Sequence, residues 1–139
     1  MHVVDDAIAG SDALATSLVL AKAIEKIGPV DLVVTGLGST DAGLSIIPAM
    51  LAERLNLPQV TLAAVVESQG NQVRIKRDTD AATEVIGGVM PLVLSVTDQS
   101  GEARYPSFKG IMAAKKKPLE AWGLGDLGIN AGTVGLAAA

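Results

Sequence analysis

A glycine-rich loop that also carries hydroxyl and carboxyl side chains is the first stretch of this sequence that could bind a ligand. Gly36, Gly38 and Gly43 allow the backbone to approach a bound group closely, while Ser39, Thr40, Asp41 and Ser45 can bond to ribose or phosphate. The loop follows an apolar run and precedes a helical pattern, which is the geometry that points N–H groups at an anion. It contains neither a Walker lysine nor a full dinucleotide fingerprint. The alternative is a tight strand-to-helix turn whose polar side chains serve only as caps.

A second chemically distinctive stretch combines basic side chains with the aromatic residues Tyr105 and Phe108. Residues 102–117 contain five basic side chains and one acidic side chain, a net charge of +4; because the whole chain carries −4, the remaining residues carry −8. Pro106 and Gly110 interrupt regular structure around Phe108, so we expect an exposed loop with an apolar tip, followed by a short helix that ends in lysines. Such a tip fits a pocket on a partner protein. The alternative is that Phe108 folds back into the protein's own core.

Charged side chains also cluster at residues 77–84, where Arg77, Asp78, Asp80 and Glu84 occur together. They indicate either a contact with a partner protein or a strand end that is simply exposed to solvent. The lysine run 115–117 is not interpreted as a nucleic-acid site, because the sequence pI is near 4.8 and stacking aromatic residues are absent nearby. We expect Trp122 to anchor the following segment by packing.

The chain contains few of the side chains that commonly act in catalysis. There is no cysteine, so disulfides, iron–sulfur ligation and thiolate catalysis are excluded. His2 is the sole histidine, which leaves no Ser-His-Asp triad and no group of zinc ligands. We therefore predict no catalytic residues and no metal site.

Length and composition favour a single α/β domain. The 139 residues are 49% hydrophobic but only 2% aromatic, as expected of a doubly wound, mainly parallel sheet covered by helices rich in small residues. The longest apolar runs are far shorter than the roughly 20 residues that cross a bilayer, so no membrane insertion is expected. The first residues lack the pattern of an export signal.

The order of elements follows from hydrophobic periodicity and breaker residues. We predict a helix from residue 11 to 27 with Leu14, Leu18, Ala21, Ile24 and Ile27 toward the core, a buried strand at 31–35, and a helix at about 44–55. Residues 59–67 and 72–77 should form a hairpin, with further strands at 85–86 and 92–96. Residues 1–118 are expected to form the nucleotide-binding domain, including a loop at 104–117, and residues 119–139 an extended tail ordered by a partner.

Two motifs in this order resemble the electron-transfer flavoprotein beta subunit. One is an Arg-Tyr pair followed by an apolar anchor, an Ile-Met pair and a lysine run, here Arg104, Tyr105, Phe108, Ile111, Met112 and Lys115 to Lys117. The other is Ile75, Arg77, Asp80, Glu84, Ile86, Pro91, Val93 and Leu94, with a departure at Ala81 and Ala82, where the family usually has Gly or an acid. The resemblance extends from about residue 11 to residue 128.

The resemblance implies a Rossmann-like, adenine-nucleotide-binding domain whose loop and first helical turn bind AMP in a structural role. The matching residues are Gly36, Leu37, Gly38, Ser39, Thr40, Asp41, Ala42, Gly43, Leu44, Ser45, Ile46 and Ile47. It also implies that the segment containing Arg104, Tyr105, Phe108, Ile111 and Met112 docks with a dehydrogenase. Asp78 would pair with an arginine of the mobile flavin domain. Family members are longer, so the resemblance implies a chain shortened at both ends.

In function, the resemblance implies a heterodimer with an alpha subunit that holds most of the FAD. This bacterial-type, cytoplasmic carrier, itself not an enzyme, would accept electrons from acyl-CoA dehydrogenases of fatty acid beta-oxidation and related flavoproteins and pass them toward a membrane quinone reductase. Two alternatives stay open. One is a bifurcating relative with a second FAD in place of AMP, and the other is a stand-alone adenine-nucleotide-binding module.

Overall fold

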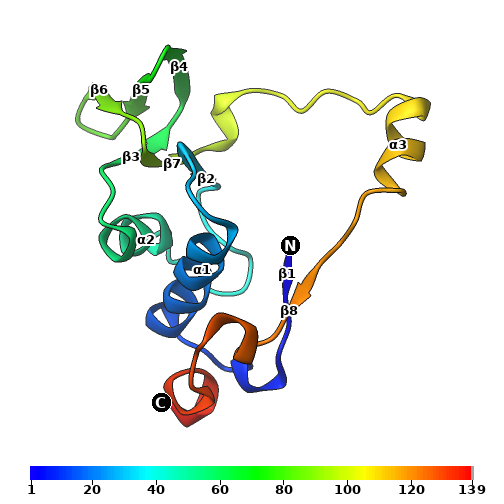
Figure 1. The fold of residues 1–139 in the computed structure, drawn as a ribbon. Helices are drawn as coiled ribbons and strands as arrows, with labels where there is room; N and C mark the ends of the chain where they lie inside the picture. Colours follow the sequence, from blue (N-terminus) through cyan, green and yellow to red (C-terminus); the bar gives the residue numbers. More distant parts are fainter. Residues whose placement is uncertain (139) are drawn as a thin grey trace.

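A three-stranded parallel sheet forms the centre of the protein. The computed structural model describes residues 1–138, shown as a ribbon in Figure 1. Strand β7 (Leu92–Val96) lies between β2 (Leu32–Thr35) and β3 (Gln59–Ala63), with parallel pairing on both sides. The three residues Leu92, Val93 and Leu94 are buried. A strand with neighbours on both edges and layers on both faces reads as a continuous apolar run, which explains its sequence.

Helices α1 (Ala13–Ile27) and α2 (Ile47–Leu55) pack against each other beside this sheet. The Asp12 carboxylate caps α1 by accepting a hydrogen bond from the Ala15 N–H at 2.8 Å. The Arg54 guanidinium joins the helices, because its Nε donates to Ser17 Oγ at 2.9 Å and its Nη2 donates to the Leu14 carbonyl at 3.0 Å. This contact gives the buried Ser17 hydroxyl a charged partner.

The existence of α1 is confirmed and Ala21 is buried as predicted, but the rest of its fully buried face differs from the prediction. The buried positions are small residues and one valine, namely Ala15, Ser17, Val19, Ala21 and Ala23. Leu14 and Ile27 are more than half exposed. The helix lies close to α2 and to the C-terminal segment, and close packing there selects small side chains.

Helix α2 begins at Ile47, three residues later than predicted. Pro48 accounts for the difference, because proline lacks an N–H and is accommodated only in the first helical turn. Ser45 adopts a left-handed conformation with φ of 55°, so the chain before Ile47 is not helical.

A second, antiparallel sheet extends from the central one. It contains β4 (Val65–Gln69), β5 (Gln72–Asp78) and β6 (Thr83–Val89), in that order. The predicted hairpin is present as β4 and β5, but residues 59–67 do not form one strand. The stretch bends at residue 64, between β3, which pairs with β7, and β4, which pairs with β5. Leu62, with a φ of 62°, lies within β3, where the register with β7 shifts. Val73 and Ile75 of β5 pack on the same core as Val60 and Leu92.

The C-terminal segment is folded, in contrast to the predicted extended tail. Strand β8 (Ala121–Trp122) pairs in parallel with β1 (His2–Val3), and short 3-10 turns follow at Gly125–Leu127, Ala131–Thr133 and Gly135–Ala137. Its apolar residues complete a second core with α1, consisting of Ala15, Val19, Ala23, Trp122, Leu124, Leu127 and Val134. The segment is thus ordered by the chain's own first helix.

Trp122 is a packing anchor, as predicted. Its side chain is buried, and the Lys26 ammonium lies 5.1 Å from the centre of its ring. Lys26 Nζ also donates to the Asp126 carbonyl at 2.9 Å. The end of α1 and the C-terminal segment are therefore joined by both polar and apolar contacts.

A long excursion separates β7 from β8. It includes a 3-10 turn at Asp98–Ser100 and the helix α3 (Phe108–Ala114), and every residue from 98 to 121 is exposed. In Figure 1 this segment extends away from the two sheets and from α1 and α2. Within residues 1–138, no helix combines the length and the apolar character that a membrane crossing requires.

Gly135 gives a direct test of how tightly the C-terminal segment packs. Gly135 and Gly128 have nearly equal φ values of 62° and 65°, so replacing either by alanine carries a similar left-handed penalty of roughly 1–2 kcal/mol. A Cβ atom at Gly135 would also overlap the carbonyl oxygen of Ala7, whereas a Cβ at Gly128 would meet nothing within 4 Å. We expect Gly135→Ala to lower the free energy of unfolding in urea clearly more than Gly128→Ala. Equal losses would contradict this packing.

Candidate functional site

A cleft opens at the carboxyl end of β2, where the chain leaves the parallel sheet. Its volume is about 730 Å³, within the usual range for small-molecule sites. The floor and walls come from β2, the following loop, the first turn of α2 and one face of α1. In open parallel sheets, ligands bind outside the carboxyl ends of the strands, next to the point where the order reverses. The cleft lies at the carboxyl end of β2, which fits the first part of this rule.

Most of the loop residues that the sequence analysis singled out line this cleft. They are Gly36, Leu37, Gly38, Ser39, Asp41, Ala42, Leu44, Ser45 and Ile47. Thr40, Gly43 and Ile46 belong to the same loop without lining the cleft. A larger hollow of about 820 Å³ lies against β4, β5 and β6, away from these residues.

One wall of the cleft escaped the sequence analysis. Residues of α1, including Asp12, Thr16, Leu20 and Ile24, face the loop across the cleft. The sequence does contain a signal for this wall, because α1 has more large apolar residues than one buried face can hold. Its alanines are buried, and Leu20 and Ile24 face the cleft instead. Leu20 is 39% exposed and Leu37 is 45% exposed, so the cleft presents apolar walls to solvent.

The loop is shaped by short-range hydrogen bonds and by glycine. The Gly43 N–H donates to the Ser39 carbonyl at 2.9 Å, and Gly43 has a φ of 61°, which favours glycine. A Cβ at Gly38 would lie 3.1 Å from Ser45 Oγ, so the beginning and the end of the loop approach closely there.

Asp41 is the ionised group of the loop. The Ser39 hydroxyl, and then the Ala42 N–H at 2.9 Å, stabilise its carboxylate and hold the pKa of Asp41 below its usual value. The side chain is therefore an anion at neutral pH. A carboxylate in this position can accept hydrogen bonds from sugar hydroxyls, and it repels a phosphate placed beside it.

The residues that line the cleft include no Lys, Arg or His. Any anionic group would therefore be held by backbone N–H groups and by hydroxyls such as those of Ser39 and Ser45. Ile46, which precedes α2, makes no side-chain cap hydrogen bond to the first turn, and the start of a helix carries partial positive charge. Apolar walls for a flat base, a carboxylate for hydroxyl groups and a helix start for a phosphate together fit a nucleotide.

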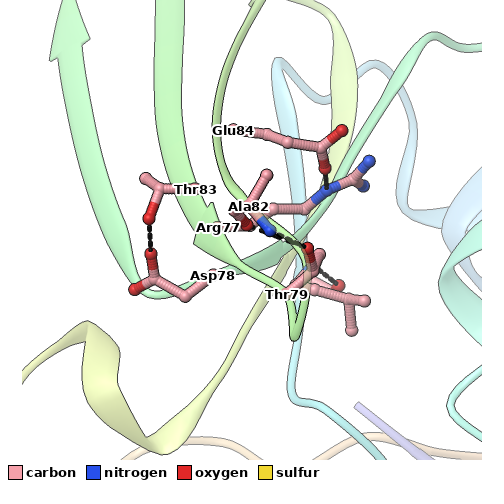
Figure 2. A network of polar contacts seen from close by, with 8 residues as sticks. Arg77, Asp78, Thr79, Ala82, Thr83 and Glu84 are labelled. Atoms are coloured by element: carbon pink, nitrogen blue, oxygen red, sulfur yellow. Dashed lines mark hydrogen bonds and ion pairs between the residues drawn. The ribbon is translucent and has the colours of Figure 1, made fainter.

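The charged cluster at residues 77–84 is divided between the two faces of the β5–β6 hairpin. Figure 2 shows Arg77 paired with Glu84 across the strands, and Asp78 accepting a hydrogen bond from the Thr83 hydroxyl. The turn is closed by Thr79, whose N–H and hydroxyl both donate to the Ala82 carbonyl, at 2.9 Å and 2.8 Å. The hairpin end is thus a rigid structure that presents Asp78 to solvent.

The aromatic and basic stretch is exposed, so the alternative of a Phe108 folded into the core is wrong. Tyr105 is 97% exposed and Phe108 is 79% exposed. Ile111 and Met112, on the same side of α3, are each more than 40% exposed. The Ser107 hydroxyl caps α3 by accepting a hydrogen bond from the Gly110 N–H at 3.1 Å. Because α3 follows β7, the excursion that carries it leaves the parallel sheet at the same carboxyl edge as the cleft.

Among residues 1–138, no group of three or more His, Cys, Asp or Glu side chains is arranged to hold a metal ion.

Comparison with known proteins identifies the family to which these features belong. The family model described as the electron transfer flavoprotein domain matches residues 1–127. The chain is 40% identical over 137 residues to the electron transfer flavoprotein subunit beta of Mycobacterium leprae (strain TN), covering 99% of this chain and 52% of the relative. The protein of the same name from Mycobacterium tuberculosis (strain ATCC 25618 / H37Rv) gives the same identity and coverage.

A relative with a different name is also similar. The caffeyl-CoA reductase-Etf complex subunit CarD of Acetobacterium woodii is 32% identical over 132 residues, covering 95% of this chain and 50% of the relative. The chain thus spans about half the length of the curated relatives it matches.

Proposed function

Because this chain belongs to the electron transfer flavoprotein family, as a beta-subunit member, we propose that it is the nucleotide-binding and docking part of a heterodimeric electron carrier. The observation that carries the proposal is the cleft of about 730 Å³ at the carboxyl edge of the parallel sheet. It has room and chemistry for a nucleotide but contains no catalytic group. We propose that the nucleotide has a structural role in this cleft.

The proposed nucleotide is AMP. The apolar side chains of α1 and of the loop would hold the adenine ring, and the Asp41 carboxylate would accept from the ribose hydroxyls. The N–H groups at the start of α2 would bind the phosphate, which has no basic side chain beside it. FAD supplies the redox chemistry when bound and would be held mostly by an alpha subunit.

The proposed electron donors are acyl-CoA dehydrogenases and related flavoproteins in the cytoplasm, and the electrons would pass on toward a quinone reductase. Arg104, Tyr105, Phe108, Ile111 and Met112 would form the docking surface. An exposed aromatic side chain on a projecting helix can enter a partner's pocket without any rearrangement of the body.

Asp78 is proposed to contact the flavin domain of the alpha subunit. Its Oδ1 accepts from Thr83, which fixes the side chain, and its second oxygen can accept from an arginine of the partner. An exposed ion pair is worth about 0.2–1 kcal/mol, a strength suited to a domain that must move between positions.

The similarity to CarD favours a second candidate. That relative is named as a subunit of a complex with a reductase, so we also consider a carrier of the bifurcating kind, in which the same cleft binds a second FAD. The two candidates differ in the nucleotide that the beta subunit holds.

The first prediction concerns this nucleotide. We expect the complex with an alpha subunit to release AMP and one FAD per heterodimer on denaturation, as measured by mass spectrometry of the supernatant. Asp41→Asn should weaken AMP binding by about tenfold, because hydrogen bonds to a charged acceptor are stronger than those to an amide. Asp31→Asn is the matched control, since Asp31 is exposed and lies outside the cleft. Release of two FAD and no AMP would favour the second candidate.

A further prediction concerns the contact with the flavin domain. Asp78→Ala should change the population of domain orientations in the heterodimer, measured by small-angle X-ray scattering, while the AMP content stays the same. Asp80→Ala, two residues further along the turn, removes the same charge from the hairpin and should have a smaller effect. Identical scattering for both variants and the unaltered complex would exclude the Asp78 contact.

The last prediction of this group concerns docking. Truncating a buried interface aromatic typically costs 2 kcal/mol or more, so Phe108→Ala should slow electron acceptance from the dehydrogenase by more than about tenfold. The thermal midpoint should not change, because Phe108 contributes nothing to the core. Leu119→Ala is the control, because Leu119 is 73% exposed and lies in the same segment outside α3. A normal rate for Phe108→Ala would falsify the docking role.

A further inference from the structure

The basic segment, residues 102–117, forms no ion pair with the rest of the protein among residues 1–138. Its bases are Arg104, Lys109, Lys115, Lys116 and Lys117, and Glu102 is its one acid. Among residues 1–138, the two ion pairs are Lys22–Glu25 and Arg77–Glu84, so none of these five bases is paired. Within the same described residues, no hydrogen bond joins residues 102–117 to the rest of the protein.

The apolar side chains of the basic segment share one side of α3. Phe108, Ile111 and Met112 have the spacing of neighbours on a helix surface, and all three are exposed. Lysines lie beside this apolar face and at its C-terminal end, and Tyr105 precedes it. Apolar and aromatic residues on one face, with lysines around them, are typical of helices that lie in the interface of a membrane.

We propose that the basic segment binds peripherally to anionic lipid surfaces. Phe108, Ile111 and Met112 would enter the boundary between headgroups and acyl chains, and the lysine run would lie among the lipid phosphates. The contact is reversible and involves no spanning helix. It goes beyond the proposed carrier function and requires neither a bound nucleotide nor an alpha subunit. Lipid binding and dehydrogenase docking would exclude each other, because both use Phe108, Ile111 and Met112.

Charge distribution favours a lipid surface as the partner. The segment carries +4 and the rest of the chain −8, and α3 stands apart from the rest in Figure 1. Interactions between exposed charges are largely screened beyond about 8 Å at physiological ionic strength, so α3 can meet an anionic surface while the acidic body remains in solvent.

The kinds of basic residue point the same way. Four of the five bases are lysines, which are flexible point charges, whereas fixed pairing with carboxylates favours arginine. Within the described residues, no hydrogen bond holds any of the lysine ammonium groups of the segment in place. Such mobile charges suit a fluid array of phosphates better than a pocket of defined shape.

The test is co-sedimentation of the full chain with lipid vesicles at physiological ionic strength. Vesicles of phosphatidylcholine containing phosphatidylglycerol should bind the protein at least about tenfold more tightly than vesicles of phosphatidylcholine alone, and added salt should reverse the binding. The variant K116E/K117E should lose this binding by about tenfold or more. Phe108→Ser should weaken it by a smaller factor, without changing its dependence on salt.

The matched control is R74E/K76E, which reverses the same number of charges on the exposed face of β5. It should bind anionic vesicles much more tightly than K116E/K117E does, and both variants should keep the thermal midpoint of the unaltered chain. Equal binding to the two kinds of vesicle, or equal losses in the two charge variants, would overturn the proposal. So would absent vesicle binding combined with slower electron acceptance in K116E/K117E, because the bases would then serve a protein partner.

Discussion

Parallel pairing of β7 with both β2 and β3 is the constraint from which the positions of the other parts follow. Because the three strands run in the same direction, their carboxyl ends share one edge of the sheet. The loop after β2 and the excursion after β7 must both start from that edge. The loop of the cleft and the excursion that carries α3 therefore start at the same edge of the sheet, although more than 50 residues of sequence lie between their first residues. A burial-driven pairing of three apolar strands thus determines where the functional surfaces begin.

Two separate hydrophobic cores stabilise different parts of the protein. One core joins the central sheet to β5 through Val60, Val73, Ile75 and Leu92. The other joins α1 to the C-terminal segment around Trp122. Arg54 connects them by linking α2, beside the sheet, to Ser17 of α1. The cleft lies between α1 and the loop that leads from β2 into α2, and the Arg54 contact joins the two helices beside it.

Sequence reasoning was most accurate where one local signal dominates. The apolar run at 31–35, the breaker residues of the loop and the lysine-rich excursion each have a local cause, and the structure contains a strand, a loop and an exposed segment there. The buried face of α1 could not be predicted in this way, because it depends on which neighbours approach the helix. The division between β3 and β4 depends on pairing with different partner strands, β7 and β5, which no local feature of residues 59–67 indicates. The folding of residues 121–137 depends on contacts with α1, more than 90 residues away.

The exposure of every residue from 98 to 121 also bears on how the protein can change over generations. Substitutions at exposed positions without special contacts usually alter stability by less than about 0.5 kcal/mol. Selection on this segment therefore acts mainly through its contacts with other molecules. Substitutions in β7 and β8, at its two ends, are instead limited by packing in the two cores. Substitutions in this one segment can therefore change its external contacts during evolution, while the sheet and the cleft stay the same.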